Sequence, residues 1–378
     1  MRVRLGDYIK EYSVRNKAGE DIPVYSVTNT QGFCRDYFGK EVASKDKSTY
    51  KIVPKGYFAY NPSRINVGSV DWQRNEDRVI VSPLYNVFSV ANELNQQYLY
   101  YYLKSDITLH RIKSIATGSV RDNLKFDMLS EFKINLPNVN KQISIINILD
   151  KIGMLIRKQQ TEIEKLDDLI KSRFVELFGD PEENPYGWDK MPLSEVVINA
   201  NNGMARRGND EDGNIVMRLV ELQDGYINYS NPNRIVLKDN EKKRYLLKEK
   251  DFLFARVNGN PDNVGRCAVF HDIGEEVYHN DHIIRVHFNE ELLDGTFASA
   301  LLNSDYGKRQ LKSQIKTSAG QYTVSQDGIG AIVTILPSME KQNQFADFVK
   351  QVDKSKLLEW INLAKKSFDL LHERIYIW

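Results

Sequence analysis

The side chains best spaced for metal binding are three histidines near residue 280. His279, His282 and His287 follow the pattern His-x2-His-x4-His, with no cysteine or HExxH motif beside them. Without either of these, the spacing of the histidines alone is a weak signal for a metal site. If residues 283–288 form a strand, His282 and His287 point to opposite faces, because side chains alternate along a strand. We therefore predict no metal site.

The motifs of catalytic chemistry are also missing from the sequence. There is no GxxxxGK[ST] phosphate loop, no GxGxxG dinucleotide loop and no GxSxG nucleophile turn. Amino-methyltransferases carry Asn or Asp followed by Pro-Pro and an aromatic residue, whereas Asn61, Asn184 and Asn231 each precede a single proline. Pro261-Asp262 begins a nuclease-like pattern, but no Asp/Glu-x-Lys follows. We predict a chain with no catalytic residues and no cofactor of its own.

Composition limits the class of protein. The 378 residues are 41% hydrophobic and 27% charged, with a formal net charge of +1, which predicts two or three globular domains. No apolar run approaches the roughly 18–20 residues of a membrane helix. Cys34 and Cys267 are far apart, so we expect no disulfide framework and a cytoplasmic location. Residues 1–136 carry 20 Lys+Arg against 15 Asp+Glu, and residues 187–336 carry 18 against 21, so charge alone does not identify a partner.

The chain repeats itself. The segment 136–142, Leu-Pro-Asn-Val-Asn-Lys-Gln, returns as Leu-Pro-Ser-Met-Glu-Lys-Gln at 336–342. Shorter matches precede it in the same order: 103–106 with 302–305, 66–68 with 263–265, and 58–59 with 254–255. The offset between matches drifts slowly and in one direction, which indicates an internal pseudo-two-fold duplication.

Each copy combines a mixed α/β (α+β) domain with a long helix. Short apolar or alternating runs at 51–60, 78–81, 250–256 and 283–288 predict strands. We therefore predict a first domain over 1–136, a central spacer helix over 137–180, a second domain over 181–336 and a C-terminal spacer helix over 337–378.

The two helices carry apolar residues at alternating spacings of three and four. In the first helix this seam contains one polar residue, Gln159, between apolar positions from Leu149 to Ile170. Asn138 is the expected N-cap, and Gly179-Asp180-Pro181 ends the helix. The second helix has Ser338 at the equivalent cap. Its expected seam is Leu357, Ile361, Ala364, Phe368, Leu371, Ile375 and Trp378. Two such helices are expected to pair as an antiparallel coiled coil, and residues 139–178 would extend about 60 Å. The alternative is that each helix folds back on its own domain.

These features together resemble one family, the specificity (S) subunits of type I restriction-modification systems. The resemblance covers essentially the whole chain. It rests on the duplication, on Leu-Pro-x4-Gln before each long helix, and on the junction from Glu176 to Trp188. The segments 53–61 and 81–88 are similar to first-domain motifs, and 250–256 is similar to the second-domain counterpart.

The resemblance implies a DNA-binding subunit that is not itself an enzyme. The two domains would be target recognition domains, each reading one half of a split, asymmetric sequence in double-stranded DNA. The paired helices would set the gap and dock two methyltransferase (M) subunits, and restriction (R) subunits would join them. S-adenosylmethionine, ATP and Mg would belong to those partners.

Base edges are read mainly by Arg, Asn and Gln, and phosphates by Lys, Arg, Ser and Thr. Such residues gather in loops at equivalent places of the two copies. In the first copy the candidates are Ser63, Arg64, Asn66 and Arg74, then Lys113, Thr117, Arg121 and Asn123. In the second copy they are Arg256, Asn258, Asn260 and Arg266, then Lys316, Ser318, Gln321 and Tyr322, with Arg206 and Arg207 forming a third loop.

A different function remains open from the sequence alone. The long helices could form a coiled-coil scaffold, with α/β domains that bind protein or glycan.

Overall fold

The computed structural model describes residues 2–35, 46–116, 123–318 and 320–372. Contacts divide the chain into two compact units. The first unit contains the residues up to Lys158 and the chain from Leu363 onward; the second contains Gln159–Asn362. The four domain boundaries expected from the sequence stay a prediction.

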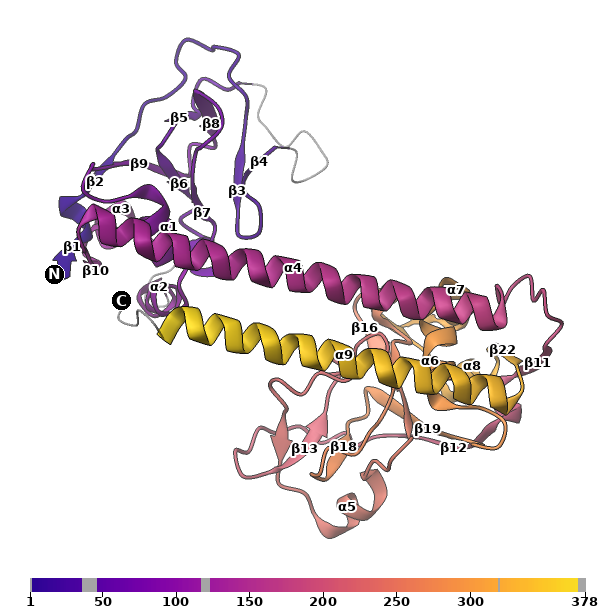
Figure 1. Ribbon diagram of the computed structural model, residues 1–378. Coiled ribbons are helices and arrows are strands. Elements are labelled where there is room, and N and C mark those ends of the chain that lie inside the picture. The colour runs from indigo at the N-terminus through magenta and orange to yellow at the C-terminus, as the bar shows by residue number, and fades with distance from the viewer. Residues whose placement is uncertain (1, 36–45, 117–122, 319, 373–378) are drawn as a thin grey trace. The chain divides into compact units, whose positions relative to one another are not determined.

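The first unit is built around a four-stranded antiparallel sheet with the order β2-β9-β6-β7 (Figure 1). Smaller antiparallel pairs, β1-β10, β3-β4 and β5-β8, flank it. Its strands are β1 (Arg2–Arg4), β2 (Ile9–Glu11), β3 (Ser26–Thr28), β4 (Gly32–Cys34), β5 (Lys51–Pro54), β6 (Phe58–Tyr60), β7 (Val70–Trp72), β8 (Arg78–Val81), β9 (Asn86–Val90) and β10 (Lys133–Asn135). Its helices are α1 (Gln96–Lys104), α2 (Asp106–Ala116) and α3 (Phe126–Ser130).

The second unit repeats this plan and adds to it. Its central antiparallel sheet has the order β12-β19-β15-β17, and β11 pairs with β22 as β1 pairs with β10. Two further sheets, β14-β13-β18 and β16-β21-β20, extend the domain. Its strands are β11 (Asp189–Pro192), β12 (Val197–Asn202), β13 (Asn214–Met217), β14 (Arg234–Ile235), β15 (Phe252–Ala255), β16 (Val257–Asn258), β17 (Cys267–Val269), β18 (Val277–His279), β19 (Ile283–Phe288), β20 (Lys316–Ser318), β21 (Gln321–Thr323) and β22 (Val333–Leu336). Its shorter helices are α5 (Asp239–Tyr245), α6 (Gly295–Asn303), α7 (Asp305–Gln314) and α8 (Gln326–Gly330).

The shared Leu-Pro-x4-Gln motif ties each long helix to its domain. Gln142 is fully buried; its amide accepts from the backbone N–H of Asn95 at 2.8 Å and donates to the carbonyls of Glu93 and Pro137. Gln342 makes the same three bonds at the same places of the second unit: it accepts from the N–H of Asp294 and donates to the carbonyls of Leu292 and Pro337. Because Asn95 and Asp294 are the N-caps of α1 and α6, the motif anchors the long helix to the short helix that covers the sheet.

The first long helix, α4, runs over Val139–Phe178, as the sequence predicts. The Asn138 side chain accepts from the Lys141 N–H at 2.9 Å, which confirms the expected cap. The helix ends before Gly179, whose φ is +73° and where an added Cβ would lie 2.4 Å from a carbon of Pro185. A residue with a side chain would meet both the positive φ and this contact, so glycine is required here.

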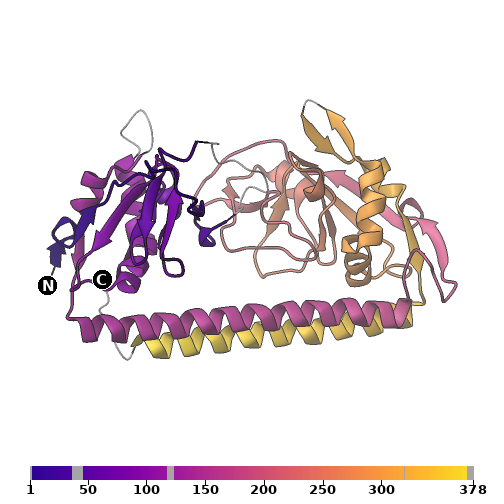
Figure 2. The same cartoon turned by 90° about the horizontal axis from the view of Figure 1, so that it is seen from above.

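The second long helix, α9 (Met339–His372), runs antiparallel to α4 within the second unit. Asp167 forms an ion pair with Lys356 at 2.7 Å, while Phe174 lies against Phe345, so ascending numbers on one helix meet descending numbers on the other. The two helices lie side by side in both views (Figure 1, Figure 2).

The seam expected on α9 is wrong by about one residue. Leu357 and Ile361 are 60% and 42% exposed, and Ala364 is exposed as well. The contact face instead contains Phe345, Val352 and the half-buried Lys356. An apolar pattern could not reveal a seam that includes a lysine. The expected seam residues Phe368 and Leu371 have side chains outside the described part, and Ile375 and Trp378 lie outside the described residues.

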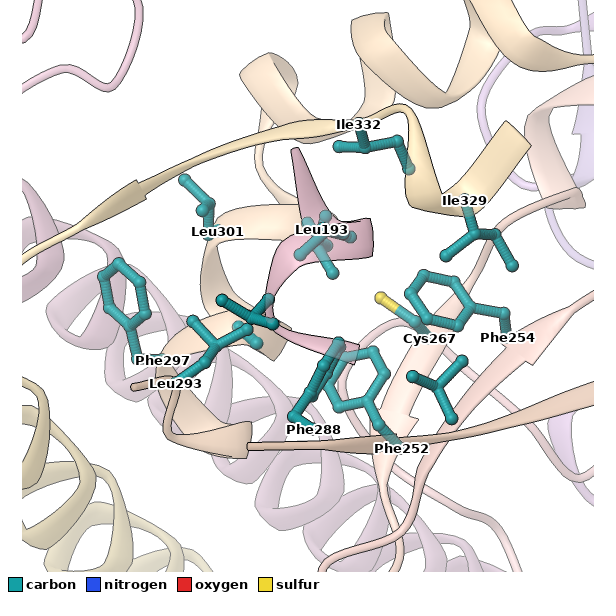
Figure 3. Packing of buried hydrophobic residues seen from close by; sticks show 14 of the residues in the cluster. Leu193, Phe252, Phe254, Cys267, Phe288, Leu293, Phe297, Leu301, Ile329 and Ile332 are labelled. Carbon is teal, nitrogen blue, oxygen red and sulfur yellow. The ribbon is translucent and has the colours of Figure 1, made fainter. Parts of the chain in front are cut away.

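A continuous core joins the second unit to its helices (Figure 3). Phe252, Phe254 and Phe288 come from the sheet, and Phe297 comes from α6. The Phe297 ring lies 4.7 Å from that of Phe178 and 5.6 Å from that of Phe174, so aromatic contacts hold helix α4 against α6. In the first unit Ile145 and Ile146 of α4 enter the core in the same way.

Candidate nucleic-acid interface

A small sheet brings two of the candidate loops of the second unit together. Strand β16 follows β15 directly and pairs with β21, so that Asn258 faces Tyr322 and Val257 faces Thr323 in register. Strand β21 also pairs with β20, forming a hairpin in which Ser318 faces Gln321. The hairpin stands out from the second unit on the side away from α4 and α9 (Figure 2). Residues far apart in the sequence, near 257 and 320, therefore share one exposed edge.

An open cleft of about 330 Å³ lies beside this hairpin. It is lined by Asn202, Arg256, Lys316, Thr323, Val324, Ser325, Gln326 and Asp327. The Gln326 amide donates to the Asn202 side-chain oxygen at 3.3 Å, joining the start of α8 to the end of β12. The Arg256 guanidinium donates to the backbone carbonyl of Asp281 at 3.1 Å. The cleft therefore presents amide, guanidinium and ammonium groups together with one carboxylate, that of Asp327.

Three other candidate arginines of the second unit form ion pairs within the protein. Arg206 binds Glu241 through two nitrogens, at 3.1 and 2.8 Å, and this hydrogen-bonded guanidinium lowers the pKa of the Glu241 carboxyl. Arg207 lies 2.6 Å from an Asp281 carboxylate oxygen. The Arg266 guanidinium lies 3.3 Å from Asp224 and also donates to the Gln223 side chain at 3.3 Å. These contacts fix the orientation of each arginine and leave less of its charge for an external anion.

Two candidate asparagines shape a loop. Asn258 accepts a hydrogen bond from the Asn260 N–H at 2.9 Å, and Asn260 accepts one from the Asp262 N–H at 3.1 Å. Each of these hydrogen bonds closes a turn in which the asparagine side chain takes the place of a backbone acceptor. Their side-chain oxygens are therefore engaged, while the turn as a whole stays on the exposed edge.

The remaining candidates of the second unit lie on the hairpin. Lys316 and Gln321 are exposed, whereas Tyr322 is half-buried and packs on the core. Ser318 lies in β20, and its side chain is outside the described part.

The first unit brings the equivalent loops together. The Ser63 hydroxyl lies 2.5 Å from the Asn123 side-chain oxygen, and the Leu124 N–H donates to the Pro62 carbonyl at 3.1 Å. Arg64 is exposed and Asn66 half-buried, at a turn of 3-10 helix over Ile65–Val67. The candidate Lys113 is exposed in the last turn of α2, while Thr117 and Arg121 lie outside the described residues.

The candidate Arg74 packs against two aromatic rings of the first unit. Its guanidinium lies over the Trp72 ring at 4.4 Å and the Tyr100 ring at 5.3 Å, and it donates to the buried Asp71 carboxylate at 2.8 Å. Gln97 accepts from the Trp72 indole at 3.3 Å. Such a packed and paired arginine stabilises the fold of the loop that carries it.

Some lining residues of the cleft were missed by the sequence prediction. Gln326 and Asp327 follow the expected loop by only a few residues, so a wider loop boundary would have included them. Asn202 could not be found in this way, because only the β12–β19 pairing brings it to the cleft.

A second cavity, of about 390 Å³, lies near Arg266. Its lysines are paired: Lys308 with Asp224 and Lys312 with Asp262, each at 2.8 Å. Both lysines of this cavity therefore have a carboxylate partner within the protein.

The described residues hold no cluster of three or more His, Cys, Asp or Glu side chains suited to a metal ion. His279 is buried, and its Nδ1 lies 3.1 Å from the Tyr245 carbonyl; burial lowers its pKa to about 4. Cys34 and Cys267 are free. No helix among the described ranges is long and apolar enough to cross a membrane.

The fold and the paired loops thus define a duplicated α/β protein in which equivalent loops of each unit form an exposed edge. Comparison with known proteins identifies the family. A model of the type I restriction modification DNA specificity domain matches residues 5–166 and again residues 185–363. The chain belongs to this family, and it is a specificity subunit of a type I restriction-modification system with two recognition domains.

Known members share low identity with the chain over long alignments. The specificity subunit of the type I restriction enzyme StySPI from Salmonella potsdam is 23% identical over 361 residues, which cover 91% of this chain and 78% of that protein. The EcoKI specificity subunit of Escherichia coli (strain K12) is 20% identical, over 68% of this chain and 58% of that protein. A solved structure from a study of type I R-M system assembly shares the fold, with a TM-score of 0.54 at 13% identity, and the match covers 98% of this chain and 94% of that one.

Proposed function

We propose that each unit reads one half of a split, asymmetric DNA sequence, while the paired long helices set the gap between the half-sites. The observation that carries this proposal is the duplication of the scaffold without duplication of its exposed loops. The central sheets have the same strand order, and Gln142 and Gln342 make matching hydrogen bonds. The loops at the two equivalent edges differ in residue type, which supports two unlike half-sites.

The long helices suit a spacer. At 1.5 Å per residue, the 40 residues of α4 correspond to about 60 Å, whereas one turn of DNA is about 34 Å. Recognition elements held at the two ends of such a helix would contact separate turns of one duplex.

The outer face of α9 supports docking of protein partners. Leu357, Leu358, Trp360 and Ile361 are all between 42% and 60% exposed. Contiguous exposed apolar residues mark protein-binding surfaces. We propose that two methyltransferase subunits bind the paired helices and that restriction subunits join them in the cytoplasm, where the DNA is.

On this proposal the chemistry belongs to the partners. Methyl transfer from S-adenosylmethionine, and DNA cleavage with ATP and Mg, would be carried out by the methyltransferase and restriction subunits. This chain would recognise the DNA target sequence and would bind no cofactor.

The spacer role is tested by inserting one heptad within residues 149–170 of α4 and one at the facing stretch of α9. Seven residues add about 10.5 Å of helix, or about three base pairs. We expect the gap in the selected DNA sequence to lengthen by about three base pairs, with both half-sites unchanged. A matched control inserts seven residues at Gly274, in the exposed turn 271–276, and should leave the gap unchanged. An unchanged gap in the double insertion would contradict the proposal.

A further inference from the structure

We infer that the cleft beside the β20–β21 hairpin, and not the loop of Arg206 and Arg207, reads purine edges in the DNA half-site of the second unit. The inference rests on the proposed function and deepens it by assigning specificity to particular side chains. The groups that carry it are Asn202, Gln326 and Arg256, with Lys316 at the rim.

The amide groups that line the cleft carry the donors and acceptors that adenine recognition needs. The Asn202–Gln326 hydrogen bond uses the Asn202 oxygen and one Gln326 N–H. An amide carries two N–H donors and a carbonyl oxygen, so the pair keeps donors on both side chains and the Gln326 oxygen as an acceptor. Asn and Gln side chains bind the N6 and N7 atoms of adenine through one donor and one acceptor. A bonded amide pair holds that pattern in a fixed orientation.

The candidate arginines of the second unit differ in whether a carboxylate pairs with them. Arg206, Arg207 and Arg266 each have a carboxylate within 3.3 Å. Among the described contacts of Arg256, its guanidinium donates once, to a backbone carbonyl, and no carboxylate forms an ion pair with it. Of these four arginines, Arg256 is therefore the one without a carboxylate partner among the described contacts, although Asp327 lines the same cleft, and it keeps further N–H donors. Arginine in this state suits the O6 and N7 acceptors of guanine.

The internal duplication shows which residues of the first unit occupy the positions of Arg256 and Gln326. Phe58-Ala59 corresponds to Phe254-Ala255, so Arg256 occupies the position of Tyr60. Likewise Gln326 begins α8 as Phe126 begins α3.

The first-unit residues at these two positions are part of its core. Tyr60 is fully buried and its hydroxyl donates to the Leu124 carbonyl at 3.1 Å, while the Phe126 ring lies 5.9 Å from that of Phe88. Aromatic side chains at these two positions are therefore compatible with the fold. An arginine and a glutamine at the same two positions, lining an open cleft, are explained by a ligand better than by packing.

Lys316 has a separate role in this arrangement. It is exposed at the start of the hairpin and lines the same cleft. A flexible ammonium group at the rim suits a phosphate of the strand whose bases enter the cleft.

The test measures DNA preference of the full chain with its methyltransferase subunits, using duplexes that carry every base at each position of both half-sites. The informative variants are Gln326→Phe, which restores the aromatic residue of the first unit, and Arg256→Ala. We expect each to reduce discrimination by about tenfold at one or two purine positions of one half-site, with the other half-site unchanged. Lys316→Ala should instead weaken binding to all sequences alike and lower the slope of log affinity against log salt by about one.

Arg207→Ala is the matched control, because Arg207 is exposed and already paired; it should leave both half-sites unchanged. Thermal melting confirms that each variant is folded. Wild-type preference in Gln326→Phe and Arg256→Ala would overturn the inference, as would equal losses at both half-sites or an equal effect of Arg207→Ala. If the wild-type complex itself showed no two-part preference, the proposed function would fail first.

Discussion

Gln142→Leu should destabilise the first unit while leaving the second unit intact. The substitution keeps the side chain at nearly the same size but removes its amide. The Asn95 N–H and the carbonyls of Glu93 and Pro137 then lose their hydrogen-bond partner. Because Gln142 is fully buried, water does not reach its position in the folded state.

The expected loss follows from these three groups. Leaving a buried polar group without a partner costs about 1–3 kcal/mol, and Glu93 lies at an exposed position where water can compensate in part. We therefore expect a loss of about 3 kcal/mol in the free energy of unfolding. For a unit of this size that corresponds to a fall of roughly 6–12 °C in melting temperature.

The assay is calorimetric melting of the full chain, in which the two units are followed as separate transitions. Gln342→Leu is the matched variant and should lower the transition of the second unit by a similar amount, because it breaks the same three bonds there. Lys141→Ala, at the exposed neighbouring position, should change stability by less than about 0.5 kcal/mol. Gln142→Leu with a melting curve like that of Lys141→Ala would refute the anchoring role of the motif.

Three further predictions follow from individual contacts and from the charge of the chain. The pKa of buried His279 is about 4, so as the pH falls from about 6.5 to 4 the unfolded chain binds a proton that the folded chain does not. Stability of the second unit should therefore fall by about 3 kcal/mol over this window, and His279→Gln should flatten the pH dependence in urea titrations. Lys356→Ala removes ion pairs to Asp167 and Asp353 and should cost about 1 kcal/mol, reduced in 1 M salt; a salt-independent loss would point to packing instead. Because the net charge is +1, the chain alone should bind DNA weakly and with a shallow salt dependence, and nanomolar, steeply salt-dependent binding without partners would contradict this.

Much of the scaffold could be predicted from the sequence, because the duplication places the same sequence pattern in both copies. The bounds of α4 follow from Asn138 and Gly179, two residues whose local roles are readable without any tertiary contact. The face of α9 that packs against α4 could not be predicted, because a helix rich in apolar residues has more than one apolar face. The partner helix decides which stripe is buried, and here the choice includes Lys356, which an apolar pattern excludes.

The candidate site was predictable as loops but not as individual residues. Equivalent loops do meet in both units, through the Pro62–Leu124 and the Val257–Thr323 contacts. Whether an arginine forms an ion pair within the protein depends on its tertiary neighbours. Arg206 meets Glu241, 35 positions away, and nothing in the local sequence indicates that pair.

A binding selection from a random duplex library tests whether the two unlike units recognise a split site. The chain is used with its methyltransferase subunits, and the enriched duplexes are sequenced. Split-site recognition predicts two unlike short motifs at one fixed separation among the enriched duplexes. A single contiguous motif, or no enrichment, would contradict it and would favour a scaffold that binds other molecules.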